Sequence, residues 1–583
     1  MSEFPIAGSY RPTVMGTHGM VSSGHYLASL AGERILARGG NAVDAGVAAG
    51  LCLCVLQTDM VNLAGVAPMI LYLADEDRVT TVSGLGRWPK AASLEHFLKH
   101  HDGRIPMGVQ RCVTPAGLDA WVKALNEFGT MTLAEVMEDA AQLAESGFPM
   151  HPFMAANLRD GAATFGQWAS STAIFAPGGR VPEPGDIFVQ ADLGRTMRRV
   201  LAAEAAARFQ GRSAALQAAR DAFYKGDIAR EISDFYQSQG GFLSYEDLAA
   251  YESQLEAPVR VQFGEYEIYT CGPWCQGPVL AQVLALLAND DLKALGHNSP
   301  AYVHLVTEAL KLVFADRERY YGDPEFVDVP MEAMLSAHYA EARRELIQPD
   351  KAIPGMPAAG DPWNGNGTAA EPWRGLQPAV HGATPTAQTL DTTYVCTVDR
   401  HGNVFSATPS DTCMNAPVTP GLGLTISTRG SQNWAVEGHA SAIAPWKRPR
   451  LTPNPALIFK NGKPFMPLGS PGGDVQCQSM LQVFLNVAVF GMSPQAAIEA
   501  PRFGTYSHPG SFEPHEYFPD ELRMEARLAA EVGDSLADKG HKVVSWPDWT
   551  WKAGGVCAIT IDHESGVMAA GADPRRMSYA IGW

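Results

Sequence analysis

A long segment without helical or strand periodicity leads directly into a strand in the second half of this chain. Residues 351–391 contain six prolines and six glycines, and the run that follows, TTYVCTVD, is rich in β-branched and aromatic residues. Such a segment, about forty residues long, is uncommon inside a compact protein and is usually functional or a linker. The chain is therefore expected to form either two domains around this segment or one layered body whose sheets draw strands from both parts.

Hydrophobic periodicity predicts a helix-rich first part and a second part that begins with strands. Residues 23–57 have helical spacing with a break at Gly39-Gly40-Asn41, which predicts two helices. The run 45–57 is too short to span a bilayer and is expected to be a buried helix. Further predictions are helices over 116–147, 191–253, 301–322, 479–500 and 520–540, and strand pairs over 69–84, 259–272 and 556–572.

Composition describes an ordinary folded globule and restricts its partners. Hydrophobic residues make up 46% and charged residues 18% of the 583 positions, and the net charge is 44 − 62 = −18. Nucleic acid and anionic membrane are not expected as partners, because both need clustered Lys and Arg. Nine scattered cysteines and the absence of a signal-like N-terminal pattern predict a reduced, cytoplasmic protein. A homo-oligomer remains open.

Thr392 and Thr393 stand at the start of the strand, and the simplest interpretation is a β-branched pair on an edge strand. A cut between Asp391 and Thr392 would change this, because it would give Thr392 a free α-amino group. An α-amine has a pKa of about 7.7 to 8, so it can accept the proton of the adjacent hydroxyl. Thr392 would then supply both nucleophile and base, as in threonine-type N-terminal nucleophiles.

Such a nucleophile needs hydrogen-bond donors for an oxyanion. The run PLGSPGGDVQCQ, residues 467–478, predicts a strand, a glycine-rich turn and the start of a helix. Backbone N–H groups of Gly472 and Gly473 are the candidate donors. A plain turn is the simpler interpretation, and a phosphate cradle is disfavoured because the lysine and spacing of a P-loop are missing.

Many blocks of this sequence resemble the gamma-glutamyltranspeptidase family of N-terminal nucleophile hydrolases, over nearly the whole length. The blocks occur in the family's order: ILARGGNAVDAGVAA, FGTMTLAEVMEDAAQLAESGFP, GGFLSYEDLAAY, EALKLVFADRERYYGDPEFVDVP, TTYVCTVDRHGNV, PWKRP, GSPGGD, EAPRF and GADPRR. The resemblance implies an α/β (α+β) fold, a four-layer αββα sandwich. It also implies a precursor cut between Asp391 and Thr392. The large fragment would be 1–391, with the linker 351–391 at its end, and the small fragment 392–583 would carry the nucleophile. The two fragments would stay associated.

Several positions depart from the family's pattern around the nucleophile and the substrate α-carboxylate. Tyr394 replaces the histidine of the usual Thr-Thr-His motif. The arginine that binds the α-carboxylate aligns with Leu85, and Arg87 is the candidate to replace it. Ser410 aligns with the second hydroxyl residue that the family has after the nucleophile strand. Thr412 aligns with a position where the family usually has an asparagine.

The segment that holds the substrate α-amino group in typical members aligns with STRGSQN, residues 427–433. Asn433 stands at the position of the family's acidic residue, and Gly430 stands at the position of its glutamine. Arg429, next to Gly430, is an additional positive charge. A serine pair that contacts the carboxylate aligns with Leu451-Thr452. Losing a carboxylate and gaining a guanidinium disfavours a substrate ammonium and favours an anion. These changes resemble the amidohydrolase branch, which includes oxamate amidohydrolases.

The sequence therefore predicts an autoprocessing threonine amidohydrolase or acyltransferase, which cleaves the amide of a small anionic acyl group through an ester on Thr392. A γ-glutamyl hydrolase or transpeptidase that acts on glutathione or γ-glutamyl amides is the alternative within the enzymes. An uncut pseudoenzyme scaffold is the alternative outside them. No cofactor and no metal are predicted, since Cys271 and Cys275 lack a second pair and His508 and His515 lack metalloprotease spacing.

Overall fold

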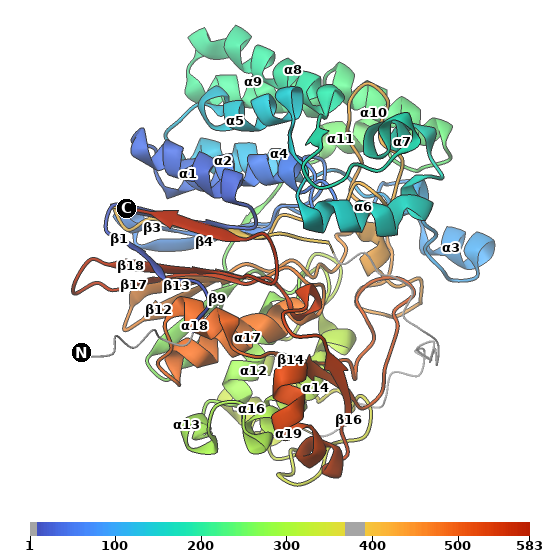
Figure 1. The fold of residues 1–583 in the computed structure, drawn as a ribbon. Helices are drawn as coiled ribbons and strands as arrows, with labels where there is room; N and C mark the ends of the chain where they lie inside the picture. The colour runs from blue at the N-terminus through green and yellow to red at the C-terminus, as the bar shows by residue number, and fades with distance from the viewer. Residues whose placement is uncertain (1–8, 368–390) are drawn as a thin grey trace.

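The structure is a computed structural model that describes residues 9–367 and 391–583, so part of the predicted linker lies outside the described residues. Two seven-stranded sheets pack face to face, and helices cover both outer faces (Figure 1). This arrangement confirms the αββα sandwich. One sheet has the order β1 (Val14–Gly16), β18 (Met568–Ala572), β17 (Cys557–Ile561), β13 (Lys463–Gly469), β12 (Ala456–Lys460), β9 (Tyr266–Thr270), β8 (Val259–Phe263). The other has the order β19 (Tyr579–Gly582), β2 (Gly19–Ser23), β10 (Val395–Asp399), β11 (Val404–Ala407), β3 (Met69–Leu73), β4 (Arg78–Val82), β7 (Leu255–Glu256).

Each of the two large sheets contains strands that precede residue 391 in the chain and strands that follow it. Strand β10 pairs antiparallel with β2 on one side and with β11 on the other, and β12 pairs with β9. Of the two architectures that the sequence allowed, the structure therefore has the single layered body. Two smaller sheets complete the strands: β5 (Phe148–Pro149) with β6 (Ile187–Phe188), and β14 (Phe503–Thr505) with β15 (Glu521–Glu525) and β16 (Lys542–Trp546).

The helices form two groups, one outside each sheet (Figure 1). The first group comes from the first part of the chain: α1 (Tyr26–Ala37), α2 (Ala42–Leu56), α3 (Leu94–His101), α4 (Gly117–Phe128), α5 (Leu133–Ser146), α6 (Pro152–Phe165), α7 (Ala169–Phe175), α8 (Ala191–Ala207), α9 (Arg212–Tyr224), α10 (Asp227–Ser238), α11 (Tyr245–Ala250). The second group draws on both parts: α12 (Gly277–Leu286), α13 (Leu292–Leu295), α14 (Pro300–Tyr320), α15 (Met331–Met334), α16 (Ala337–Arg344), α17 (Val475–Ala488), α18 (Pro494–Glu499), α19 (Ala526–Asp538).

Most predicted elements are confirmed, and the differences have local causes. Helix α2 begins at an Asn41 capping box and is buried along its whole length, as expected for 45–57. The predicted helix over 520–540 is wrong at its start, because Glu521–Glu525 pairs on both edges with β14 and β16. The predicted helix over 479–500 is two helices, since Ser493 caps a new helix with Pro494 in its first turn. None of the helices in the described residues is long and apolar enough to cross a membrane.

Two buried histidines cap helices with an unprotonated ring nitrogen. Nδ1 of His25 accepts from the Leu27 N–H at 3.2 Å, and Nδ1 of His151 accepts from the Met154 N–H at 3.1 Å. The two rings lie 5.2 Å apart, centroid to centroid. Burial, followed by the nearby His151, lowers the pKa of His25 to about 3, and burial also lowers the pKa of His151. Both histidines are therefore held neutral by the fold.

We expect the free energy of unfolding to fall as the pH drops from 7 to 5. The unfolded chain gains protons on these histidines near pH 6.5, about the ordinary histidine pKa, while the folded chain does not. Their stabilisation is thus complete above that pH and is lost as the pH falls towards the lower folded pKa, by up to about 1.4 kcal/mol per pH unit for each ring. Urea unfolding at a series of pH values measures this slope. His25→Asn keeps a cap acceptor that cannot titrate and should make the slope shallower, so an unchanged slope would contradict the assignment.

Candidate active site

Thr392 lies at the entrance to β10, buried at the centre of the sandwich. Its side chain is 1% exposed, and its hydroxyl Oγ1 lies 2.6 Å from the Ser410 hydroxyl Oγ. The Thr392 N–H donates to the Met60 carbonyl at 2.9 Å, and the Thr393 N–H donates to the Pro409 carbonyl at 3.0 Å. These two backbone hydrogen bonds hold the chain at the predicted nucleophile just before β10 begins.

The backbone of Thr392 is strained. Its φ angle is +104°, in a region that β-branched residues rarely adopt. Such a conformation costs about 1 to 3 kcal/mol and persists only where the surroundings hold it. The peptide bond between Asp391 and Thr392 therefore joins a strained residue to the chain before it. No pattern in the sequence indicates this strain.

Arg429 connects the residues on both sides of that bond. Its Nη2 donates to Asp391 Oδ2 at 2.7 Å and also to the Ser410 hydroxyl, and its Nε lies 3.5 Å from Asp411 Oδ2. Burial alone lowers the pKa of Arg429, but Asp391 and Asp411 more than offset this and the pKa is raised. Among the described residues, Nη1 has no hydrogen-bond partner. The Arg429 guanidinium therefore stays charged, and its Nη1 can still donate a hydrogen bond.

Thr412 and two residues that the sequence did not indicate complete the contacts around the bond. The Thr412 N–H donates to Asp391 Oδ2 at 3.2 Å. The Gln476 amide lies 3.4 Å from Thr392 Oγ1, and Nη1 of the buried Arg576 donates to the Thr392 carbonyl at 3.4 Å. Gln476 belongs to the run PLGSPGGDVQCQ and Arg576 to the block GADPRR, but neither motif assigns these side chains a role at the nucleophile. Only the tertiary fold places them beside Thr392.

The glycine-rich turn lies between β13 and α17, as predicted. Gly472 and Gly473 have φ angles of +126° and +59°, which glycine adopts freely. The Gly473 carbonyl accepts from Gln276 at 2.9 Å, and the Gln476 amide, in its better-bonded orientation, accepts from the Gly473 N–H at 3.3 Å. The turn is therefore next to Thr392 through Gln476. The role of the two N–H groups as oxyanion donors stays a prediction.

Three predicted substrate-binding residues are engaged elsewhere. Nη1 of Arg87 donates to Glu325 Oε2 and to the Trp446 carbonyl, each at 3.0 Å. Thr452 Oγ1 accepts from Gln432 at 2.8 Å. A substrate carboxylate at Arg87 would have to compete with Glu325, so the structure does not bring Arg87 into the Thr392 group.

Asn433 is the third of these residues, and its amide is fully used by the fold. Its Oδ1 accepts from Trp88 Nε1 at 2.8 Å, and its Nδ2 donates to the Ser441 carbonyl at 2.6 Å. We expect Asn433→Asp to lower the free energy of unfolding by about 2 kcal/mol or more, because a buried carboxylate would face a carbonyl without a proton to share. It should not create γ-glutamyl activity. Urea unfolding measures the stability of the variant, and a γ-glutamyl anilide assay measures its activity. A variant that is as stable as the natural chain and hydrolyses the anilide would contradict the prediction. Asn461→Asp, on a surface turn, is the matched control.

Tyr394 is accommodated by a glycine on the facing sheet. A Cβ on Gly469 would lie 2.1 Å from the Tyr394 ring, and the Tyr394 hydroxyl lies 2.6 Å from Ser406 Oγ. The tyrosine thus fills the space between the sheets beside the nucleophile strand. Burial raises its pKa well above the ordinary value, so the phenol keeps its proton.

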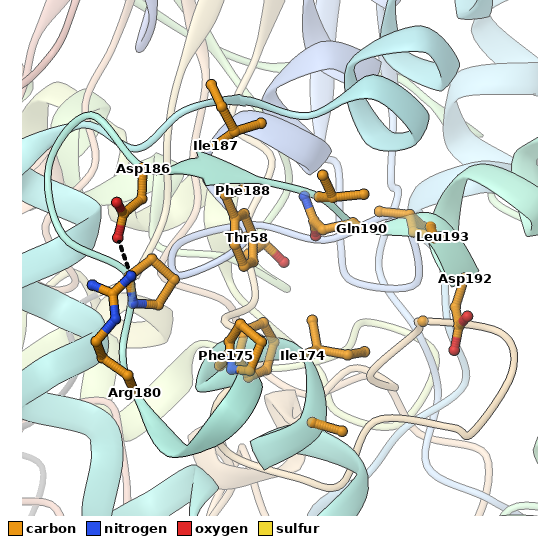
Figure 2. Close-up of a pocket in the computed structure, with 16 residues that line it drawn as sticks. Thr58, Ile174, Phe175, Arg180, Asp186, Ile187, Phe188, Gln190, Asp192 and Leu193 are labelled. Carbon is orange, nitrogen blue, oxygen red and sulfur yellow. Dashed lines mark ion pairs between the residues drawn. The ribbon is translucent and has the colours of Figure 1, made fainter.

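The residues that hydrogen-bond Thr392 do not line the cavity in Figure 2. It has a volume of about 410 Å³ and lies between α7, β6 and α8, with an Arg180–Asp186 ion pair of 2.8 Å at its edge. Among the described residues that line it, none is a predicted site residue. It therefore does not identify the substrate site.

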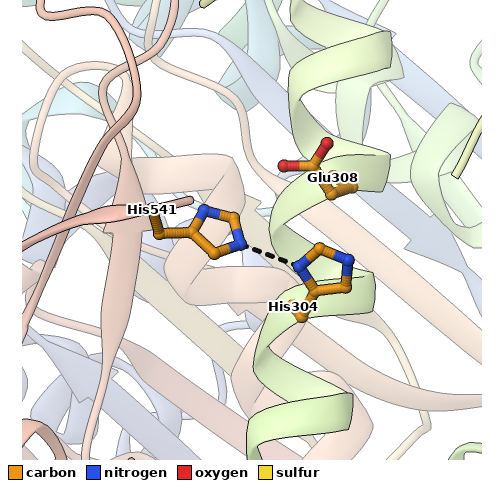
Figure 3. A group of neighbouring side chains, drawn as sticks. All are labelled: His304, Glu308 and His541. Atoms are coloured by element: carbon orange, nitrogen blue, oxygen red, sulfur yellow. Dashed lines mark hydrogen bonds between the residues drawn. The ribbon is translucent and has the colours of Figure 1, made fainter. Parts of the chain in front are cut away.

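A second cluster, His304, Glu308 and His541, brings three possible metal ligands within 4.8 Å of one another (Figure 3). His304 Nδ1 lies 2.8 Å from His541 Nε2, and the carboxylate of Glu308 accepts from the Lys311 ammonium at 2.9 Å. The lysine balances the charge of the carboxylate, so the cluster is satisfied by protein groups. The sequence did not indicate it, because His541 is distant along the chain.

Comparison with known proteins identifies the family of the chain. The family model for gamma-glutamyltranspeptidase matches residues 28–583. The chain belongs to the gamma-glutamyltranspeptidase family. Its relatives include the glutathione hydrolase-like YwrD proenzyme of Bacillus subtilis (strain 168), 32% identical over 98% of this chain and 99% of that protein. The acylase ACY 1 proenzyme of Pseudomonas sp. (strain V22) is 32% identical over 95% of this chain and 92% of its own length.

Two further proteins are similar to this chain over nearly its whole length. The oxamate amidohydrolase proenzyme of Klebsiella pneumoniae is 27% identical over 98% of this chain and 99% of that protein. The solved structure of LmbA2991T421A superposes with a TM-score of 0.91 at 35% identity, covering 99% of this chain and 100% of that one. These relatives support an amide hydrolase of the family with an amidohydrolase-like character.

Proposed function

We propose that the protein is the precursor of a threonine amidohydrolase that cuts itself between Asp391 and Thr392. The observation that carries the proposal is the strained, buried Thr392, whose hydroxyl lies 2.6 Å from Ser410 in a group organised by Arg429. Four of the residues that the sequence singled out, Asp391, Thr392, Ser410 and Arg429, meet here. The proenzyme names of the relatives support a precursor.

In the cutting step, the Thr392 hydroxyl attacks the Asp391 carbonyl carbon. The Oγ1–C bond forms, the C–N bond breaks, and the proton of the hydroxyl ends on the departing amine. Water then hydrolyses the ester and releases the α-carboxylate of Asp391. Relief of the strain at Thr392, about 1 to 3 kcal/mol, favours the cut. The products are fragments 1–391 and 392–583, and the second has 583 − 391 = 192 residues.

In the mature enzyme, the α-amine of Thr392 accepts the hydroxyl proton and the hydroxyl attacks the substrate amide. The amine product leaves, and water hydrolyses the ester on Oγ1. Ser410 orients the hydroxyl. The N–H groups of Gly472 and Gly473 are proposed to stabilise the oxyanion. No metal or cofactor is needed for these steps.

An anionic acyl group fits the charge of the site. In the uncut chain the Arg429 guanidinium is balanced by Asp391 and Asp411 at once. Withdrawal of Asp391 after the cut leaves the guanidinium with one carboxylate fewer, in a buried setting where a substrate carboxylate can replace it. A substrate ammonium would gain no counter-charge from Asn433, which is neutral and bonded to Trp88 and Ser441.

An amide panel tests the proposed function. Mature protein is assayed with glutathione, γ-glutamyl-p-nitroanilide, a glutaryl amide and oxamate. We expect an anionic amide without an α-amine to have a higher kcat/KM than the γ-glutamyl substrates. The opposite order would favour the γ-glutamyl hydrolase or transpeptidase alternative, which the names of the glutathione hydrolase relatives support. No turnover of any amide would favour a scaffold.

A further inference from the structure

We propose that the side chain of Asp391 occupies the place of the substrate carboxylate, so that the preferred substrates are half-amides of four-carbon dicarboxylic acids, of the succinyl type. This inference rests on the proposed function and specifies the acyl group of the same site. Asp391 is the residue whose carbonyl carbon is attacked during the cut. It is therefore the first acyl group that Thr392 carries.

The Asp391 carboxylate lies in a site that is built for an anion. Oδ2 accepts from Arg429 Nη2 at 2.7 Å and from the Thr412 N–H at 3.2 Å. Oδ1 lies 3.4 Å from both the Ser410 Oγ and the Thr392 Oγ1. The residue is 3% exposed and Arg429 is 1% exposed. Both oxygens of the carboxylate thus have donors, which are the side chains of Arg429, Ser410 and Thr392 and the backbone N–H of Thr412.

These donors stay with the nucleophile after the cut. Ser410, Thr412 and Arg429 all belong to the fragment 392–583, which also carries Thr392. The ester formed during the cut and the ester formed from a substrate join the same oxygen, Thr392 Oγ1. A substrate acyl group therefore starts at the same atom and can place its carboxylate against the same donors.

The length of the acyl group follows from the covalent structure of aspartate. Two carbons, Cα and Cβ, separate the attacked carbonyl carbon from the side-chain carboxylate. A succinyl group has the same two-carbon separation. An oxalyl group has none and cannot reach Arg429, and a malonyl group has one. A glutaryl or γ-glutamyl group has three, which moves the carboxylate past the donors.

The first test is a chain-length series with the mature protein. The p-nitroanilides of oxalic, malonic, succinic and glutaric acid half-amides are compared by kcat/KM, and butyryl-p-nitroanilide serves as the neutral control of equal length to the succinyl compound. We expect the succinyl compound to exceed its malonyl and glutaryl neighbours by about tenfold or more, because one misplaced methylene costs about 10- to 200-fold. The butyryl compound should fall below the succinyl compound by a larger factor.

The outcomes separate this inference from the proposed function. A cut, active enzyme that prefers another chain length, or the butyryl control, overturns the inference and leaves the amidohydrolase in place. A protein that stays uncut or hydrolyses none of the compounds overturns both.

A second test uses the precursor itself. Asp391→Glu adds one methylene to the acyl side chain, as glutaryl adds one to succinyl, and Asp391→Asn keeps the length but removes the charge. Both variants should cut more slowly than the natural chain, by about tenfold or more for the longer side chain. Cutting is followed on denaturing gels with freshly synthesised precursor, and Asp350→Glu is the matched control outside the site. Cutting of Asp391→Glu at the natural rate would overturn the inference.

Discussion

Thr392→Ala is expected to abolish both chain cutting and amide hydrolysis. Alanine has no hydroxyl to attack the Asp391 carbonyl, so the variant should remain one 62.6 kDa chain. Amide turnover should fall by about 10⁴-fold or more, because a nucleophile and its partners act as a unit. Denaturing gels and a p-nitroanilide assay measure the two effects on the same preparation.

Thr392→Ser is the matched control, because it keeps a hydroxyl that Ser410 can contact. It should cut more slowly than the natural chain and retain measurable turnover. Circular dichroism shows whether both variants fold. A folded Thr392→Ala protein that still hydrolyses amides at the natural rate would remove Thr392 from the mechanism.

Arg429→Gln is expected to have the second largest effect, on both stability and activity. In the uncut chain, the change leaves the buried carboxylates of Asp391 and Asp411 without their cation, which costs about 3 to 5 kcal/mol. The kcat/KM for an anionic amide should fall by about 100-fold or more, while a neutral amide of equal length loses much less. Urea unfolding and paired anionic and neutral p-nitroanilides measure these losses.

A double variant separates the two roles of Arg429. Arg429→Gln with Asp411→Asn removes two opposite buried charges together, so much of the stability should return. Discrimination in favour of the anionic amide should not return. Recovery of that discrimination would show that Arg429 acts only by supporting the fold.

Local pattern in the sequence predicted individual helices, the glycine-rich turn and the position of Thr392, whereas the αββα sandwich followed only from the resemblance to the family. Periodicity located α1, α2 and α14, and the glycine-rich turn was visible in the order of its residues. Thr392 was indicated by its place after a long irregular segment. Ser410 and Arg429 followed from a resemblance, and the structure places both within reach of Thr392.

What the sequence could not supply depends on contacts between distant segments. Thr392 has a positive φ and donates its N–H to the distant Met60 carbonyl, and no motif encodes either feature. Arg576 reaches the Thr392 carbonyl from the last residues of the chain. Arg87 looked available in the sequence, but Glu325 holds its guanidinium. Competition between partners is visible only once the chain is folded.

The most direct test of the central claim is intact-mass measurement combined with N-terminal sequencing of freshly purified, active protein. The proposed cut predicts two chains, one of them 583 − 391 = 192 residues long and beginning Thr-Thr-Tyr-Val. Fully active protein that remains a single 62.6 kDa chain, with no new threonine terminus, would contradict the claim.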